Sequence, residues 1–302
     1  MAEAEGNPDA KNYGVGIPQK QEVFFLKGSN NLDWGMKGRL SRIFNPKSGH
    51  TVMLAFDHGY FLGPTSGLER MDLSINPLVP YTDVLMCTRG ALRAVIPPDS
   101  GKAVCLRMSA GVSILKELSN EVLGVAIEDA IRLNVSAITT QAFIGGEYEK
   151  ETLENLSKLI NAGLAAGIPT LAVTAVGRDM VRDARYMGLA TRICAELGAH
   201  FVKTYYCDEG FERVTSACPV PIVIAGGKKV PEADALRMAY RAIQEGALGV
   251  DMGRNIFQSE HPIAMIQAVR AVVHDGKTDK EAYEIYQDLA KGKAERRTRN
   301  AE

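Results

Sequence analysis

A single lysine, Lys203, stands inside a short run of apolar and aromatic residues at positions 199–206. Glu196-Leu197-Gly198 precedes this run, so the pattern predicts a helix that ends at a glycine and a strand that follows it. Burial in such a strand disfavours the ammonium form, and the neutral amine is the form that attacks a carbonyl carbon to make an imine. Because side chains alternate along a strand, Tyr205 would share a polar pocket with Lys203. The alternative is that Lys203 lies at an exposed edge or reaches outward to water.

Asp57 and His58 form a second group that could do chemistry, because they follow directly after the apolar run from Thr51 to Phe56. A carboxylate at this point could keep a nearby lysine cationic or transfer protons. An imidazole could act as an acid or base, or bind an anion. The alternative is that Asp57 only caps the next turn.

Two glycine-containing segments could bind a phosphate group. Gly226-Gly227 follows a predicted strand that ends at Ala225, and Gly253-Arg254 follows one that ends at Met252. In an α/β barrel, the loops after the last two strands offer backbone N–H groups and a short helix N-terminus to phosphate. An arginine adds a bidentate contact. The alternative is that these glycines serve packing alone.

Further polar residues close to predicted strand ends are candidate substrate contacts: Arg107, Gln141, Glu147, Tyr148 and Thr174. Ordinary loop hydrogen bonds would explain them equally well. Cys207 follows the lysine closely, but a thiolate nucleophile needs a neighbouring base or cation to lower its pKa, and the sequence reveals none.

These groups can act together only if the strands that precede them belong to one sheet. Eight strand candidates alternate with helical stretches: Thr51 to Phe56, Asp83 to Cys87, Ala103 to Met108, Ala137 to Ala142, Pro169 to Thr174, His200 to Tyr205, Pro221 to Ala225 and Leu248 to Met252. This alternation indicates βαβ units, and eight of them favour a closed (β/α)8 TIM barrel with its active site at the carboxyl ends of the strands. The alternative is an open doubly wound sheet, but the first strand is not followed by a GxGxxG turn.

Helical periodicity fills many of the gaps between these strands: Glu121 to Leu133, Glu151 to Ala166, Val181 to Leu197, Glu232 to Glu245 and Ile263 to Val273. Gly35 to Ile43 predicts a short helix that closes the bottom of the barrel, and Lys280 to Ala290 predicts the last helix. We therefore expect an N-terminal arm over residues 1–30, one catalytic barrel domain over 31–290 and a basic disordered tail over 291–302.

The charges of the 302 residues nearly balance, with a formal net charge of -1. Bulk electrostatics thus favours neither nucleic acid nor a membrane as a partner, and any anion must be bound locally. The five cysteines lack CxxC spacing and predict neither a disulfide framework nor a metal site. No signal-peptide pattern and no long apolar run occur, so we expect a cytoplasmic protein.

Several of these segments resemble one known family. Asp57-His58-Gly59, Lys203, Gly226-Gly227 and Gly253-Arg254-Asn255 together resemble the class I aldolases of the archaeal fructose-bisphosphate type. Longer motifs are similar to one branch of that family, the thiolases that end autoinducer-2 breakdown in bacteria: Leu32-Asp33-Trp34-Gly35-Met36, Leu54-Ala55-Phe56-Asp57-His58-Gly59-Tyr60-Phe61, Lys203-Thr204-Tyr205-Tyr206 and Asp251-Met252-Gly253-Arg254-Asn255-Ile256-Phe257-Gln258. The resemblance extends over residues 10 to 290.

The resemblance implies a TIM barrel and a large cyclic or stacked homo-oligomer such as a decamer. It implies acetyl transfer from a phosphorylated dione to coenzyme A as co-substrate, giving acetyl-CoA and dihydroxyacetone phosphate, with no permanently bound cofactor. Lys203 would form the imine and Asp57 would assist the proton transfers. The phosphate would be held by four residues: Gly226, Gly227, Gly253 and Arg254.

One position departs from the family pattern. The wider family has a tyrosine that acts as acid and base at the end of the fourth strand, and this chain has Phe143, which transfers no proton. Tyr148, His58 or a water would take that role, or the substrate and reaction differ. Two other functions therefore stay open. They are a class I aldolase or transaldolase acting on a phosphorylated sugar, and a barrel that binds a sugar phosphate without turnover.

Overall fold

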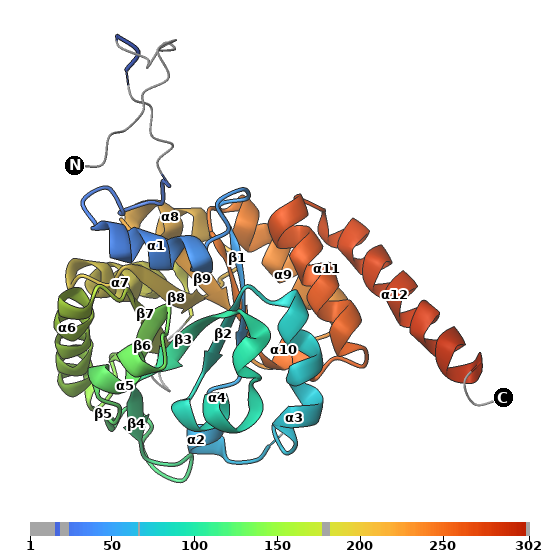
Figure 1. The fold of residues 1–302 in the computed structure, drawn as a ribbon, viewed down its shortest axis with the longest axis horizontal. Helices are drawn as coiled ribbons and strands as arrows, with labels where there is room; N and C mark the ends of the chain where they lie inside the picture. Colours follow the sequence, from blue (N-terminus) through green and yellow to red (C-terminus); the bar gives the residue numbers. More distant parts are fainter. Residues whose placement is uncertain (1–15, 19–23, 66, 177–181, 300–302) are drawn as a thin grey trace, which may run out of the picture.

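The computed structural model describes residues 16–18, 24–65, 67–176 and 182–299. Within these residues, eight parallel strands close into a barrel surrounded by helices, so the prediction of a (β/α)8 TIM barrel is confirmed (Figure 1). Around the barrel the strands follow the order β1-β10-β9-β8-β7-β6-β3-β2. Their bounds are β1 Thr51–Ala55, β2 Val84–Cys87, β3 Ala103–Arg107, β6 Ala137–Ile144, β7 Thr170–Val176, β8 Phe201–Tyr205, β9 Ile222–Ala225 and β10 Gly249–Met252.

Alternate residues of the strands face two different cores, because successive side chains point to opposite sides. Outward side chains such as Val52 pack beneath the surrounding helices. Inward side chains such as Phe201 form a second cluster with residues of and after helix α1 (Trp34–Ile43). The ring of Phe44 meets that of Phe201 edge-on, with centroids 5.6 Å apart. Apolar side chains thus fill the amino-terminal end of the barrel, and a substrate pocket has to lie at the carboxyl ends of the strands.

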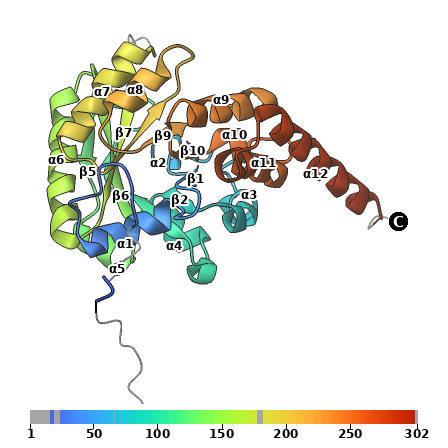
Figure 2. The same cartoon turned by 90° about the horizontal axis from the view of Figure 1, so that it is seen from above.

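The helices cover the outside of the barrel (Figure 2). The longer ones are α6 Glu149–Ala166, α7 Ala184–Glu196, α9 Glu232–Gln244, α11 Pro262–Asp275 and α12 Asp279–Arg299. The shorter ones are α2 Gly59–Leu62, α3 Met71–Ser74, η1 Asn76–Tyr81, α4 Arg89–Val95, η2 Pro98–Ser100, α5 Ile127–Arg132, α8 Phe211–Ala217 and α10 Arg254–Phe257. Among the described residues, none of the helices combines the length and the apolar composition needed to span a bilayer.

The two ends of the chain differ from the expected division. α12 runs to Arg299, through the segment after residue 290 for which we expected no regular structure, and both views show it projecting away from the barrel (Figures 1 and 2). Of the expected arm over residues 1–30, only 16–18 and 24–30 lie within the described residues. The start of the helix predicted from Val181 also lies outside them.

The predicted helix over Glu121 to Leu133 is wrong in its first half. Strand β5, Glu121–Leu123, pairs there with β4, Ser109–Gly111, as a small antiparallel sheet. Gly124 follows β5, and a Cβ at this position would press against the Cβ of Ala110. Only α5 keeps the helical period. Pairing with β4 has overridden the local helical pattern.

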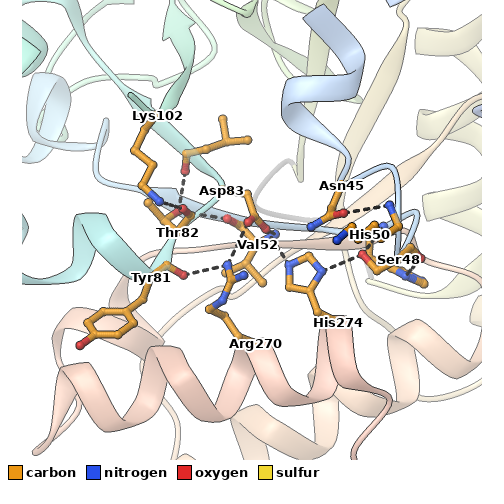
Figure 3. Close-up of polar contacts among 12 residues, drawn as sticks. Asn45, Ser48, His50, Val52, Tyr81, Thr82, Asp83, Lys102, Arg270 and His274 are labelled. Atoms are coloured by element: carbon orange, nitrogen blue, oxygen red, sulfur yellow. Dashed lines mark hydrogen bonds and ion pairs between the residues drawn. The ribbon is translucent and has the colours of Figure 1, made fainter. Parts of the chain in front are cut away.

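Asp83 joins three elements at the amino-terminal end of the barrel (Figure 3). Its Oδ2 accepts a hydrogen bond from the Val52 N–H at 2.7 Å and lies 2.7 Å from Nε2 of His274, while its Oδ1 accepts from Nη1 of Arg270 at 2.9 Å. The other ring nitrogen of His274 lies 2.8 Å from the Ser48 hydroxyl. Burial raises the pKa of Asp83, but the hydrogen bonds from His274 and Arg270 outweigh it, so the pKa is lowered. One carboxylate thus fastens β1 and the start of β2 to α11.

Replacing Asp83 with asparagine is expected to lower the free energy of unfolding by about 2–3 kcal/mol, because charge-assisted hydrogen bonds are lost. A lowered pKa means that this stabilisation is present above the unfolded value of 3.8 and is lost as the pH falls through the folded value. The difference between the free energies of unfolding of the parent and of Asp83→Asn, measured with urea, should therefore hold down to about pH 4 and shrink as the pH falls from 3.8 toward about 2. A gap that stays constant over this range would contradict the assignment.

Candidate active site

One pocket at the carboxyl ends of the strands contains the residues for which the sequence indicated a catalytic role or a place in the polar or phosphate pocket: Asp57, His58, Lys203, Tyr205, Gly226, Gly227, Gly253 and Arg254. Its volume is about 130 Å³. A larger cavity of about 930 Å³ lies at the opposite end, beside the first residues of β2 and β3. The smaller pocket is the candidate active site, because it lies where barrel enzymes do their chemistry and holds the reactive side chains.

Lys203 points into the barrel, and the alternative of an exposed edge position is wrong. The residue is 8% exposed, and its Nζ lies 2.9 Å from Oδ2 of Asp251 and 3.6 Å from the Met86 sulfur. Burial raises the pKa of Asp251 although the Lys203 ammonium opposes it. A carboxylate with a raised pKa accepts a proton more readily than an ordinary aspartate does. Asp251 is thus placed to take the proton that the amine has to lose.

Asp57 forms a buried ion pair with Arg107 from β3, so its carboxylate does more than cap a turn. Nε and Nη2 of Arg107 donate to the same oxygen, Oδ2, at 2.8 and 2.6 Å, and both residues are at most 5% exposed. Burial raises the pKa of Asp57, but the charge of Arg107 and then that of Lys203 outweigh it, and the pKa is lowered. Asp57 is therefore an anion at neutral pH, facing two cations.

His58 stacks on Phe257, with ring centroids 5.8 Å apart and planes 12° from parallel. Burial lowers the pKa of His58, the Asp57 charge raises it, and the Arg254 charge lowers it further, so the net shift is downward. The imidazole is therefore mainly neutral at neutral pH. It can donate or accept one hydrogen bond at the pocket without adding a charge.

The two glycine loops meet at the pocket, and Asn255 joins them. Its Nδ2 donates to the Gly226 carbonyl at 2.6 Å, and its Oδ1 accepts from the Val230 N–H at 2.9 Å. Gly227 has a positive φ of 69°, and a Cβ at Gly253 would overlap the Ala55 carbonyl oxygen. Both loops therefore require glycine for their shape, which brings backbone and α10 close to the pocket. Glycine loops and helix N-termini commonly offer backbone N–H groups to phosphate.

Of the candidates left open by the sequence, Arg107, Gln141 and Thr174 line the pocket. Glu147, Tyr148 and Phe143 are not among the lining residues. Cys207 is buried, and burial raises the pKa of its thiol, so it makes a poor nucleophile.

Sequence reasoning missed Asp251 and Asn255 as members of the site. Like Lys203, Asp251 is a charged residue inside an apolar strand, and such a residue indicates a functional site. A glycine, Gly253, occupies the next inward position. Asn255 had no separate signal, because only the structure reveals that its amide spans two loops.

The comparisons with known proteins agree with this geometry. The family model "DeoC/LacD family aldolase" matches residues 51–259. The chain is 62% identical to an uncharacterized aldolase of Pasteurella multocida over 288 residues, which are 95% of this chain and 99% of the relative. It is also 62% identical to the 3-hydroxy-5-phosphonooxypentane-2,4-dione thiolase of Photorhabdus laumondii over 286 residues, 95% of this chain and 98% of that protein.

Among solved structures, an archaeal fructose 1,6-bisphosphate aldolase superposes with a TM-score of 0.71 at 23% identity, covering 80% of this chain and 100% of the other. That likeness supports the barrel fold. The family match extends over most of the barrel and includes each loop that carries a reactive side chain. This chain belongs to the DeoC/LacD family of aldolases.

Proposed function

We propose that this protein is a thiolase that forms a lysine Schiff base and acts on 3-hydroxy-5-phosphonooxypentane-2,4-dione. It would transfer the acetyl group to coenzyme A and release acetyl-CoA and dihydroxyacetone phosphate, the last step of autoinducer-2 breakdown. The observation that carries the proposal is the Lys203 amine, buried beside Asp251 in a pocket that also holds both glycine loops. Relatives that bear this thiolase name are 62% and 59% identical to the chain.

The first chemical step would join Lys203 to C4 of the dione. The amine adds to the carbonyl carbon, water leaves, and an iminium results. C4 is the required position, because an iminium there accepts the electron pair of the C2–C3 bond as a C3–C4 enamine, while C2 remains a ketone that the thiolate can attack. Asp251 would accept the ammonium proton before the attack, since its Oδ2 lies 2.9 Å from Nζ.

The second step would be attack of the coenzyme A thiolate on C2. The C2–C3 bond then breaks, the acetyl group leaves as acetyl-CoA, and the electron pair enters a C3–C4 enamine. A proton returns to C3, and water hydrolyses the imine to give dihydroxyacetone phosphate and free lysine. Asp57 and His58 line the pocket on the β1 side and would transfer the protons that these steps require.

Phosphate binding would convert affinity into orientation. Gly226, Gly227, Gly253 and Arg254 line one side of the pocket, and we propose that they hold the phosphate on C5. Once the phosphate is held, the neighbouring C4 carbonyl can take few positions. Tyr205 lies on β8 together with Lys203 and lines the same pocket. Holding reactants in this way contributes a large part of many enzymatic rate enhancements.

Phe143 favours the thiolase over a class I aldolase or transaldolase. Retro-aldol cleavage requires a base for the substrate hydroxyl proton, and this position carries a buried phenyl ring that does not line the pocket. Attack of a thiolate on a ketone produces an oxyanion directly and requires no such base. The residue that departs from the wider family pattern thus agrees with the proposed reaction.

The test is the dependence of cleavage on coenzyme A. Protein incubated with the dione is expected to release acetyl-CoA and dihydroxyacetone phosphate in equal amounts, and to release neither when the thiol is absent. Equally fast cleavage without coenzyme A would identify an aldolase instead. A protein that binds the dione but produces neither product nor a reducible adduct would be the non-catalytic sugar-phosphate-binding barrel.

We further propose one catalytic domain over residues 31–290, a cytoplasmic location and assembly into a large homo-oligomer, for which a decamer is the expectation. Support for assembly comes from large apolar side chains near the amino-terminal end of the barrel, since Trp34 is 84% and Phe25 is 72% exposed. Light scattering of the purified protein would measure the number of subunits.

A further inference from the structure

Gln141 lies on β6, two strands away from the reactive lysine on β8. In the parallel sheet, Gln141 of β6 pairs in register with Val173 of β7, and Val173 pairs with Lys203 of β8. The three side chains therefore point to the same side of the sheet, with about 5 Å between neighbouring strands. Both Gln141 and Lys203 line the pocket, so a bound molecule of a few carbon atoms can contact both side chains.

Hydrogen bonds to Glu121 and Tyr60 fix the orientation of the Gln141 amide. Its Nε2 donates to Oε1 of Glu121 at 2.7 Å and to the Tyr60 hydroxyl at 3.0 Å. The Tyr60 hydroxyl donates to the same Glu121 oxygen, which closes a triangle. A carboxylate oxygen only accepts hydrogen bonds, so the NH₂ group rather than the carbonyl of the amide has to face Glu121. The Gln141 carbonyl oxygen therefore faces away from Glu121, on a side chain that lines the pocket.

The burial of Glu121 and the charges around Tyr60 preserve the hydrogen bonds of this triangle. Glu121 is 4% exposed, and the Arg107 guanidinium lies 5.5 Å from the centre of the Tyr60 ring. Burial raises the pKa of Tyr60, Arg107 opposes this, and Glu121 raises it further, so the phenol stays protonated and keeps donating. A donor held by two partners, one of them buried, is costly to rotate.

We propose that the Gln141 carbonyl oxygen recognises the C3 hydroxyl group of the substrate, with Glu121 and Tyr60 as its positioning residues. This inference rests on the proposed function. The dione carries two carbonyls and a phosphate, which accept hydrogen bonds, and one hydroxyl, which donates. An amide oxygen at this position pairs with the hydroxyl alone among these groups.

The contact also bears on which bond breaks. C3 carries a hydrogen, the hydroxyl and the acetyl group, and the bond aligned with the iminium π system is the one that cleaves. Fixing the hydroxyl sets the rotation about C3–C4, which directs cleavage to the C2–C3 bond rather than loss of the C3 proton. Gln141 would then act as a specificity determinant as well as a binding contact.

The test compares the dione with its analogue without the hydroxyl, 5-phosphonooxypentane-2,4-dione. Two readouts are used for each ketone: kcat/KM with coenzyme A, and the yield of borohydride-reduced adduct on the enzyme without coenzyme A. The parent enzyme is expected to prefer the hydroxylated ketone by about 10- to 100-fold, the effect of leaving a buried acceptor unpaired. Gln141→Leu is expected to lower this preference to about 1–3-fold, because the acceptor is gone.

Glu121→Gln tests the positioning role with little change in shape. A glutamine at 121 can donate as well as accept, so the Gln141 amide loses its fixed orientation and the preference should fall part of the way. Phe143→Leu is the matched control, since Phe143 lies on the same strand but does not line the pocket, and it should keep the parent preference. Each preference is a ratio, so partial loss of folded enzyme does not change it.

An unchanged preference in Gln141→Leu, with either readout, would overturn the inference and leave the proposed function intact. Absence of acetyl-CoA from the parent enzyme would instead overturn the proposed function. In that case the adduct yields of the two ketones would still decide whether Gln141 recognises the C3 hydroxyl group.

Discussion

Lys203→Ala is expected to abolish imine formation and to reduce turnover by about 10⁴-fold or more, because the nucleophile is lost and no other lysine is among the described residues that line the pocket. Lys203 is the lysine among the residues that line the pocket, and the remaining cations there, Arg107 and Arg254, do not form imines. Residual activity would come only from substrate orientation by the glycine loops.

Borohydride reduction in the presence of the dione, followed by mass spectrometry, measures the imine directly. The parent protein should carry one stable adduct, located on the peptide with Lys203, and the variant should carry none. An adduct on another lysine, or near-normal turnover by Lys203→Ala, would refute the mechanism.

Lys102→Ala provides a matched control. Lys102 is also a partly buried lysine, and burial lowers its pKa although the charge of Asp83 opposes this. Its Nζ donates to the Pro80 and Thr82 carbonyls at 3.0 and 2.8 Å, at the amino-terminal end of the barrel. A reactive amine would thus be available there if burial alone were sufficient. Full activity and an unchanged adduct in Lys102→Ala would link the chemistry to the pocket rather than to a perturbed lysine.

The barrel itself was predictable, because its strands are short apolar runs in which both faces are buried, and such runs are visible without knowledge of their partners. Each of the eight predicted strands exists with its ends shifted by at most two residues. The helix expected from Glu121 failed for the opposite reason. Its first residues pair with Ser109–Gly111, and the periodicity of one segment does not show which other segment will pair with it.

The site was predictable in so far as each residue stood at a strand end or contradicted its apolar surroundings. Lys203 met both conditions. The Tyr60, Glu121 and Gln141 triangle met neither, because its members come from three distant segments, and Glu121 lies on the strand that was expected to be a helix. Hydrogen-bonded groups of this kind can be identified only from the three-dimensional structure of the closed barrel.

Arg107→Met is expected to lower the free energy of unfolding by about 3–5 kcal/mol, because it leaves the Asp57 carboxylate buried without its partner. The two side chains are 5% and 6% exposed and 2.6 Å apart, so solvent screens the pair very little. Activity should also fall steeply, since the pKa of Asp57 would rise once the guanidinium no longer opposes the effect of burial. Urea unfolding and the steady-state assay measure the two effects separately.

The double variant Asp57→Asn/Arg107→Met separates stability from chemistry. With both charges removed, no buried carboxylate at position 57 is left without its partner, so most of the lost stability should return. The catalytic defect should remain, with kcat lower than in the parent by about 10²–10⁴-fold, because asparagine transfers no proton. A double variant that recovers both stability and kcat would show that the pair is structural only. A double variant as unstable as Arg107→Met would show that Arg107 stabilises the barrel through contacts other than its charge.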